Sequence, residues 1–181
     1  MKTITRSNIY MPMAALILTA ALALPAAAQT QVPFKGTFQG NDTVIPPTIS
    51  TAATGIGTLV GQLSLTDVLT LAGCDPETGV CTSGTGPGHW IAANGDSIDS
   101  TFVASAIPGA VVFTVTEIHT ITGGTGRFSG AQGTFTVHRT HVVAPSADGT
   151  HVTFGWFEGT ITSPGAPHRQ RSILAEKRCQ V

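Results

Sequence analysis

Ionisable side chains lie two residues apart in two segments that otherwise alternate between apolar and polar residues. Glu117 and His119 share a face with Phe113 in the segment 110–122, and Arg139 and His141 share the apolar face of the segment 133–143. If these faces point inward, burial of the charged groups is costly unless they pair with one another. We therefore expect one hydrogen-bonded cluster. In it, Arg139 could bind a ligand carboxylate, and Glu117 or a histidine could act as a general acid or base.

A third segment, 151–162, adds candidates because Glu158 shares a face with Phe154 and Trp156. The expected catalytic residues are Glu117 and His119. The expected ligand-binding residues are Arg139, His141, Glu158, Trp156 and Phe113. The sequence also leaves open an alternative in which the charged groups lie in solvent near the mouth of a barrel, as ordinary cross-strand salt bridges.

The elements that must position these residues have the period of two that is typical of β-strands. Strands are expected at 34–40, 89–93, 96–106, 110–122, 133–143 and 151–162, together with a run at 57–65 whose interior glycines suggest a bend. The segments 41–50 and 73–88 are expected to be loops, and 67–71 could form a helical turn. Seven or eight consecutive strands without a convincing helix predict an all-β fold, either a sandwich or a closed barrel. Closure is favoured because it leaves few strand edges unpaired.

The glycine-rich segment 123–130 separates the two strands that carry the ionisable residues. Its glycines permit a tight turn, so we expect it to set the register of that hairpin. Phe128 is expected to plug this end of the barrel, and Arg127 is expected not to contact a ligand.

Two of the three cysteines, Cys74 and Cys81, enclose a turn-forming hexapeptide, which favours a local disulfide in an oxidising compartment. Cys179 is left over and could be free or paired between chains. No histidine or second cysteine pair lies near the first two cysteines, and a strand would place His138 and His141 on opposite faces. We therefore expect neither a metal nor another cofactor.

The amino terminus resembles a secretory signal peptide, with a basic start, an apolar run at 13–24 and small residues before residue 29. The expected organisation is a signal peptide (1–28), a β-barrel domain (29–165) and a basic tail (166–181). The predicted location is secreted or periplasmic, with no membrane attachment after cleavage. Between residues 34 and 165 three basic residues stand against nine acidic ones, which argues against nucleic-acid binding.

Several short segments resemble bacterial secreted members of the allene oxide cyclase and dirigent superfamily: Phe34-Lys35-Gly36-Thr37-Phe38, Ala93-Asn94-Gly95-Asp96, residues 121–131 with Gly-Gly-Thr-Gly-Arg-Phe, and Phe157-Glu158-Gly159-Thr160-Ile161. The resemblance covers about residues 34–163. It implies an antiparallel, mostly up-and-down, eight-stranded calycin-like barrel with a central cavity, and a homo-oligomer, commonly a trimer. The plant cyclases isomerise a fatty-acid-derived epoxide without a cofactor, and dirigent proteins steer the coupling of phenolic intermediates. No catalytic residue of either group aligns onto this chain.

The function that the sequence favours is a non-catalytic binding module for a small apolar or phenolic molecule. One alternative is a cofactor-free isomerase or cyclase that uses Glu117, His119, Arg139 or His141. Another is a structural extracellular protein whose barrel is filled by its own side chains.

Overall fold

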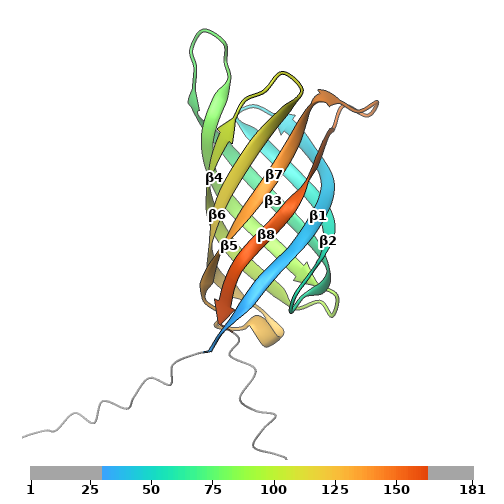
Figure 1. Cartoon of the computed structure of the whole chain (residues 1–181), viewed down its shortest axis with the longest axis vertical. Coiled ribbons are helices and arrows are strands. Elements are labelled where there is room, and N and C mark those ends of the chain that lie inside the picture. The colour runs from blue at the N-terminus through green and yellow to red at the C-terminus, as the bar shows by residue number, and fades with distance from the viewer. Residues whose placement is uncertain (1–29, 163–181) are drawn as a thin grey trace, which may run out of the picture.

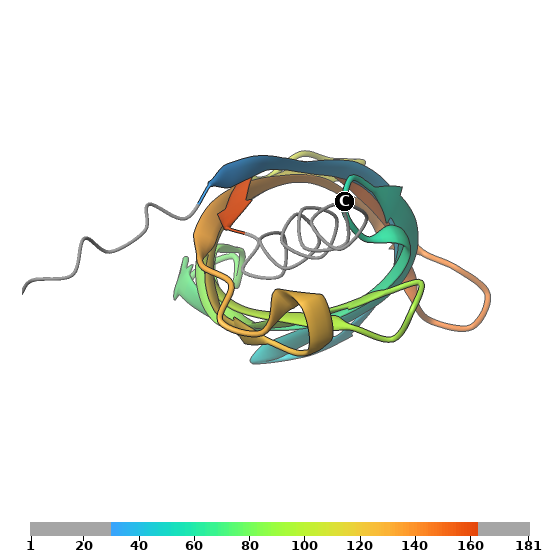
Figure 2. The ribbon, with the colours of Figure 1, turned by 90° about the horizontal axis from the view of Figure 1, so that it is seen from below.

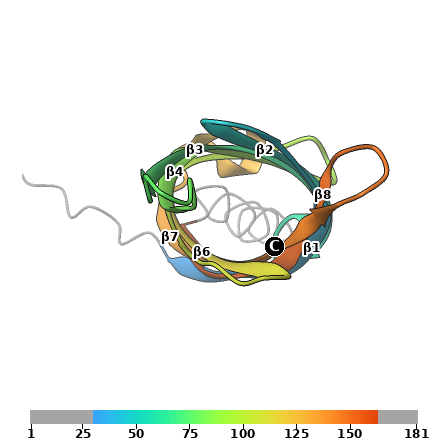
Figure 3. The same ribbon diagram turned by 90° about the horizontal axis from the view of Figure 1, so that it is seen from above.

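The computed structural model describes residues 30–162, which form a closed all-β barrel of eight strands (Figure 1). The strands are β1 (Gln31–Ile45), β2 (Thr48–Gly57), β3 (Gly61–Cys74), β4 (Cys81–Ala92), β5 (Ser97–Ile107), β6 (Val112–Gly124), β7 (Gly133–Pro145) and β8 (His151–Thr162). Each strand pairs antiparallel with the next, and β8 pairs with β1 to close the ring (Figures 2 and 3). The predicted antiparallel up-and-down barrel is confirmed.

The predicted signal peptide, the basic tail and Cys179 lie outside the described residues. In residues 30–162, no helix is long and apolar enough to cross a membrane.

Four of the expected elements are wrong, all in the first half of the chain, and the first three lie between β1 and β3. The segment 41–50 is not a loop, because β1 continues to Ile45 and β2 begins at Thr48 after the turn at Pro46-Pro47. The run 57–65 is not one bent strand but a hairpin between β2 and β3, in which Leu59 adopts a positive φ of 66°. The segment 67–71 is part of β3 and not a helical turn.

The segment 73–88 is a hairpin rather than a long loop. The predicted disulfide between Cys74 and Cys81 is confirmed, and these two residues are also register partners at the end of the β3–β4 ladder. Residues 75–80 form the tip of the hairpin, which projects from the barrel end at the top of Figure 1. The glycine cluster that follows lies within β4, where Gly84 and Gly88 are buried.

The glycine-rich segment is the β6–β7 connection, as expected, and it contains a short 3-10 helix, η1 (Gly126–Phe128). Phe128 is 1% exposed and packs with the interior apolar residues, so its predicted role as a plug is confirmed. Arg127 is held on the outside by the carboxylate of Asp96, 3.4 Å from its Nε.

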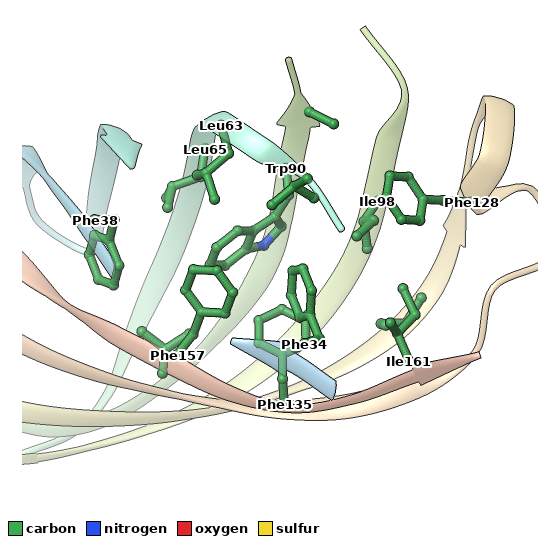
Figure 4. Packing of buried hydrophobic residues seen from close by; sticks show 14 of the residues in the cluster. Phe34, Phe38, Leu63, Leu65, Trp90, Ile98, Phe128, Phe135, Phe157 and Ile161 are labelled. Carbon is green, nitrogen blue, oxygen red and sulfur yellow. The ribbon is translucent and has the colours of Figure 1, made fainter. Parts of the chain in front are cut away.

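The barrel interior is filled with apolar side chains at the η1 end. Phe34, Trp90, Phe135 and Phe157 form its centre, with ring centroids 4.8 to 6.2 Å apart (Figure 4). Most of these contacts are edge-to-face, the arrangement that aromatic quadrupoles favour. This packed half supports a layer of charged residues in the middle of the barrel.

Candidate functional site

The centre of the polar layer is Arg139, whose side chain is 6% exposed and whose guanidinium is surrounded by three carboxylates. Its Nη1 donates to the Thr51 hydroxyl at 2.6 Å and to Asp42 Oδ1 at 3.4 Å. Its Nη2 donates to Asp67 Oδ2 at 2.8 Å and to Glu117 Oε2 at 3.2 Å. Its Nε lies 3.1 Å from Glu117 Oε1, an ion-pair contact without the alignment of a hydrogen bond. Every nitrogen of the guanidinium therefore faces an oxygen of the protein itself.

Strand alternation and register explain why these residues meet. Asp42, Asp67, Glu117 and Arg139 each occupy an inward position of a different strand: β1, β3, β6 and β7. Arg139 is the register partner of Val115, so Glu117 lies two residues further along β6. Their contact is therefore a diagonal cross-strand contact.

A second branch of the cluster runs through His119. His119 Nε2 lies 3.3 Å from Glu117 Oε2, and its Nδ1 lies 3.0 Å from the Ser100 hydroxyl. Phe102 and Phe135 stack on the imidazole, with ring centroids 4.7 and 4.6 Å away. The order serine, histidine, carboxylate is that of a nucleophilic triad. His119 and Ser100 are only 0% and 2% exposed, however, so this hydroxyl is closed off from solvent.

Burial and the single guanidinium set the protonation of the carboxylates. Burial raises the pKa of Asp67 to about 6, with the neighbouring Glu117 adding to the shift and Arg139 opposing it. Burial acts on Asp42 in the same direction, but hydrogen bonds from His141 and Thr51 and the charge of Arg139 hold the pKa of Asp42 below its ordinary value. Within the described residues, Asp67 Oδ1 has no hydrogen-bond partner, which leaves its negative charge poorly compensated.

Above the polar layer, the barrel end opposite η1 contains a cavity of about 330 Å³. The tip of the β3–β4 hairpin forms part of its rim through Thr78 and Val80. Its walls are largely apolar and include Val44, Ile49, Leu69, Leu71, Phe113 and Val115. We call this space the mouth cavity.

The ionisable groups that line the mouth cavity are Asp42 and two histidines, His141 and His151. His141 Nδ1 lies 2.6 Å from Asp42 Oδ2, so this pair joins the cavity to the buried cluster. His151 stacks on His141 with ring centroids 5.0 Å apart, and its Nδ1 lies 3.1 Å from the carbonyl oxygen of Val142. The cavity therefore combines apolar walls with one anionic acceptor and two imidazoles.

The structure divides the expected site residues into three groups. His141 and Phe113 line the mouth cavity. Arg139, Glu117 and His119 are buried in the layer beneath it and are not among the residues that line it. The expected role of Arg139 in binding a ligand carboxylate does not fit its surroundings, because its guanidinium already pairs with the carboxylates of Asp42, Asp67 and Glu117.

Trp156 and Glu158 require a correction, because they lie on the outer face of β8 and not in the interior. Trp156 is 51% exposed. Directly paired residues of antiparallel strands point to the same face, and β8 pairs inward Val137 with Phe157. Phe157 thus takes the interior position and its neighbours Trp156 and Glu158 point outward.

Sequence reasoning missed Asp42, Asp67, Thr51 and Ser100. For two of these residues, the alternation of apolar residues along the strand did indicate an inward position. Asp42 continues the inward series of Phe34 and Phe38, and Asp67 continues that of Leu63 and Leu65. The proline residues after Asp42 suggested a loop, and the segment that begins at Asp67 suggested a helical turn. Both local preferences were outweighed by the pairing of long strands.

No protein-family model matches the sequence, and no curated protein matches it. Among solved structures, the barrel resembles that of the pterocarpan synthase dirigent protein GePTS1, at 10% sequence identity over 74% of this chain and 91% of that chain. The TM-score is 0.26. The assignment of the barrel rests on its own strand pairing.

Proposed function

We propose that this protein is a non-catalytic binding module that holds a small, mostly apolar molecule in the mouth cavity. The observation that carries the proposal is the apolar space of about 330 Å³ that ends on the Asp42–His141 pair. Such a volume lies at the lower end of the range for small-molecule sites, which are typically apolar with a few oriented polar groups. A single ring with a short side chain would fit it.

The polar end of the ligand is a hydroxyl, including a phenolic hydroxyl, rather than a carboxylate. Asp42 presents an acceptor oxygen at the cavity, and a hydroxyl can donate to it. A carboxylate would instead meet Asp42 with Asp67 and Glu117 behind it, and Arg139 has no unoccupied nitrogen to offer. Like charges at this separation in a partly buried site are unfavourable.

Binding without catalysis is preferred over the isomerase alternative because a ligand in the mouth cavity would not contact the expected acid–base residues. Glu117 and His119, the residues expected to carry acid–base chemistry, do not line the cavity. An isomerase would have to use the Asp42–His141 pair. A purely structural barrel is disfavoured as well, since its interior would be filled at both ends.

Two further parts of the proposal rest on the sequence. The predicted signal peptide supports action outside the cytoplasm, and the family resemblance supports a homo-oligomer such as a trimer. Cleavage after residue 28 would be tested by mass spectrometry of the exported protein, and the oligomer by sedimentation velocity.

The binding proposal is tested with a matched pair of ligands, cinnamyl alcohol and cinnamate, titrated into the full chain and followed by NMR at pH 8. The alcohol should bind and should shift the resonances of His141 and Phe113, while the carboxylate should bind at least about tenfold more weakly. The variant Leu69→Trp fills the cavity and should lose binding. Val68→Trp is the control, since Val68 lies on the same strand but is 40% exposed on the outer face. Failure of the alcohol to bind, or unchanged binding by a folded Leu69→Trp variant, would contradict the proposal.

A further inference from the structure

A second candidate site lies on the outer surface of the barrel, across β8, β1 and β2, which are neighbours in Figure 1. Shallow hollows flank Trp156 here, and both are lined by Thr37, Ile56, Gln62 and Trp156. Because the two hollows share these four residues along the outer side of β1, we describe them together and call them the β1 slot. It is separate from the mouth cavity, because Trp156 and Thr37 face outward and do not line that cavity.

The register explains the shape of the β1 slot. Thr37 on β1 pairs with Trp156 of β8 on one side and with Ile56 of β2 on the other. A small side chain thus lies between two large ones. Neighbouring strands are about 4.8 Å apart, so the walls stand about 9–10 Å apart at their Cα atoms. Once the thickness of the side chains is subtracted, this spacing admits a single layer of six-membered rings.

Trp156 is held in place so that one face of its indole remains available. His138 on β7 stacks on the other face, with ring centroids 4.7 Å apart and planes inclined by 18°. Trp156 is nevertheless 51% exposed, and Phe154, two residues along the same strand, is 45% exposed. Two residues along a strand span about 6.6 Å, so the two aromatic side chains can contact consecutive rings of one extended ligand.

The remaining side chains of the β1 slot are polar but almost uncharged. The hydroxyls of Thr37 and Thr54 and the amides of Gln39 and Gln62 line it, and these groups can both donate and accept hydrogen bonds. Its only ionisable members are Lys35 and Glu158, which are register partners and cancel in charge.

We propose that the β1 slot binds a neutral oligosaccharide chain. The polarised C–H groups of a pyranose ring are attracted to the negative face of an indole, and its hydroxyls match amides and hydroxyls that donate and accept. Charge complementarity favours a neutral glycan over an acidic one, because residues 30–162 contain nine acidic residues against three basic ones. The closed barrel leaves no free strand edge, so a peptide could not add to the sheet in this region.

The test uses the full chain and the hexamers of neutral β-glucan, xylan, mannan and chitin, followed by tryptophan fluorescence and NMR. Trp90 is 1% exposed, so a ligand-dependent change in fluorescence reports on Trp156. At least one hexamer should bind with a dissociation constant on the order of 0.1–1 mM, as suits an open groove. Hexagalacturonate, the acidic counterpart, should bind at least about tenfold more weakly.

Variants test whether the hexamer binds in the β1 slot. Trp156→Ala should abolish binding, and Thr37→Trp should block the β1 slot from its floor. Thr101→Trp places the same side chain on an exposed position of β5 and should leave binding unchanged. Leu69→Trp, which fills the mouth cavity, should also leave binding of the hexamer unchanged. Failure of the β1-slot proposal can therefore be distinguished from failure of the mouth-cavity proposal.

Three outcomes would overturn the proposal. The first is that no neutral hexamer binds at about 5 mM, well above the expected dissociation constant. The second is that a folded Trp156→Ala protein binds as tightly as the native chain. The third is that Trp156 is instead covered by a proline-rich peptide, as shown by peptide titration, or by a second copy of the chain, as shown by an oligomer in sedimentation velocity that is lost on Trp156→Ala.

Discussion

Replacing Asp67 by asparagine should make the barrel more stable at neutral and alkaline pH. Asp67 is 2% exposed and its Oδ1 has no hydrogen-bond partner within residues 30–162. Asparagine has nearly the same shape, and its side-chain oxygen can still accept the hydrogen bond from Arg139 Nη2. The substitution therefore removes a poorly compensated charge and keeps the packing.

The sign and size of the effect follow from the pKa of Asp67, which burial raises from 3.8 to about 6. The native state then binds the proton more tightly than the unfolded state does. As pH rises through the window from about 4 to about 6, the native protein loses stability, and the loss is complete above the folded pKa. A difference of about two pKa units corresponds to about 3 kcal/mol, of which about 2–3 kcal/mol falls between pH 4 and pH 8.

The measurement is urea unfolding of the native chain and of Asp67→Asn at whole pH values from 4 to 8. The free energy of unfolding of the variant, minus that of the native chain, should increase by about 2–3 kcal/mol across this range. Groups common to both proteins cancel in the difference. Asp148→Asn is the control, because hydrogen bonds from Thr150 lower the pKa of the exposed Asp148 and its contribution changes only below about pH 4.

A difference that stays constant with pH would refute the claim that Asp67 is protonated in the native state near pH 5. A difference that falls with rising pH would show that Arg139 outweighs burial and holds Asp67 ionised. In that case the polar layer would be a fully ionic cluster at every pH in the range.

Other substitutions test the same layer and the mouth. Arg139→Met should cost about 3–5 kcal/mol in urea unfolding at pH 7, because it leaves buried carboxylates without a counter-charge, and it should cost less at pH 5. Gly88→Ala should cost about 1–3 kcal/mol in thermal unfolding, since an added Cβ would lie 2.7 Å from Asp67 Oδ1. Replacing both Cys74 and Cys81 by serine should cost about 2–3 kcal/mol, measured against the oxidised native chain, because the disulfide closes a short loop.

Much of the fold could be predicted from the sequence because half-buried strands alternate. The residues that share each face of β6 and β7 were grouped correctly from the alternation around Phe113, Val115, Phe135 and Val137. Whether that face points inward was left open by the sequence, and the register of the two strands decides it. The strands predicted at 89–93 and 96–106 leave Asn94 and Gly95 for the turn between them, and Gly95 has a positive φ of 86°. These signals are all contained within one strand or one turn.

What could not be predicted depends on pairing between strands that are distant in sequence. Asp42 and Asp67 approach Arg139 across 97 and 72 residues, and no local pattern encodes such a separation. Their own segments carried proline or a short apolar run, which favoured a loop or a helical turn. Only the ladder with neighbouring strands extends β1 and β3 far enough to bring both carboxylates inside.

The direction of β8 shows most clearly why alternation alone is insufficient. Phe154 and Trp156 occupy one face of this strand and Phe157 and Ile161 the other, so both faces contain large apolar residues. Hydrophobicity cannot choose between them. The choice is made by β7, whose inward Val137 pairs with Phe157, because directly paired side chains point to the same face. The two aromatic residues left outside are therefore a consequence of the register, and they form the wall of the β1 slot rather than part of the core.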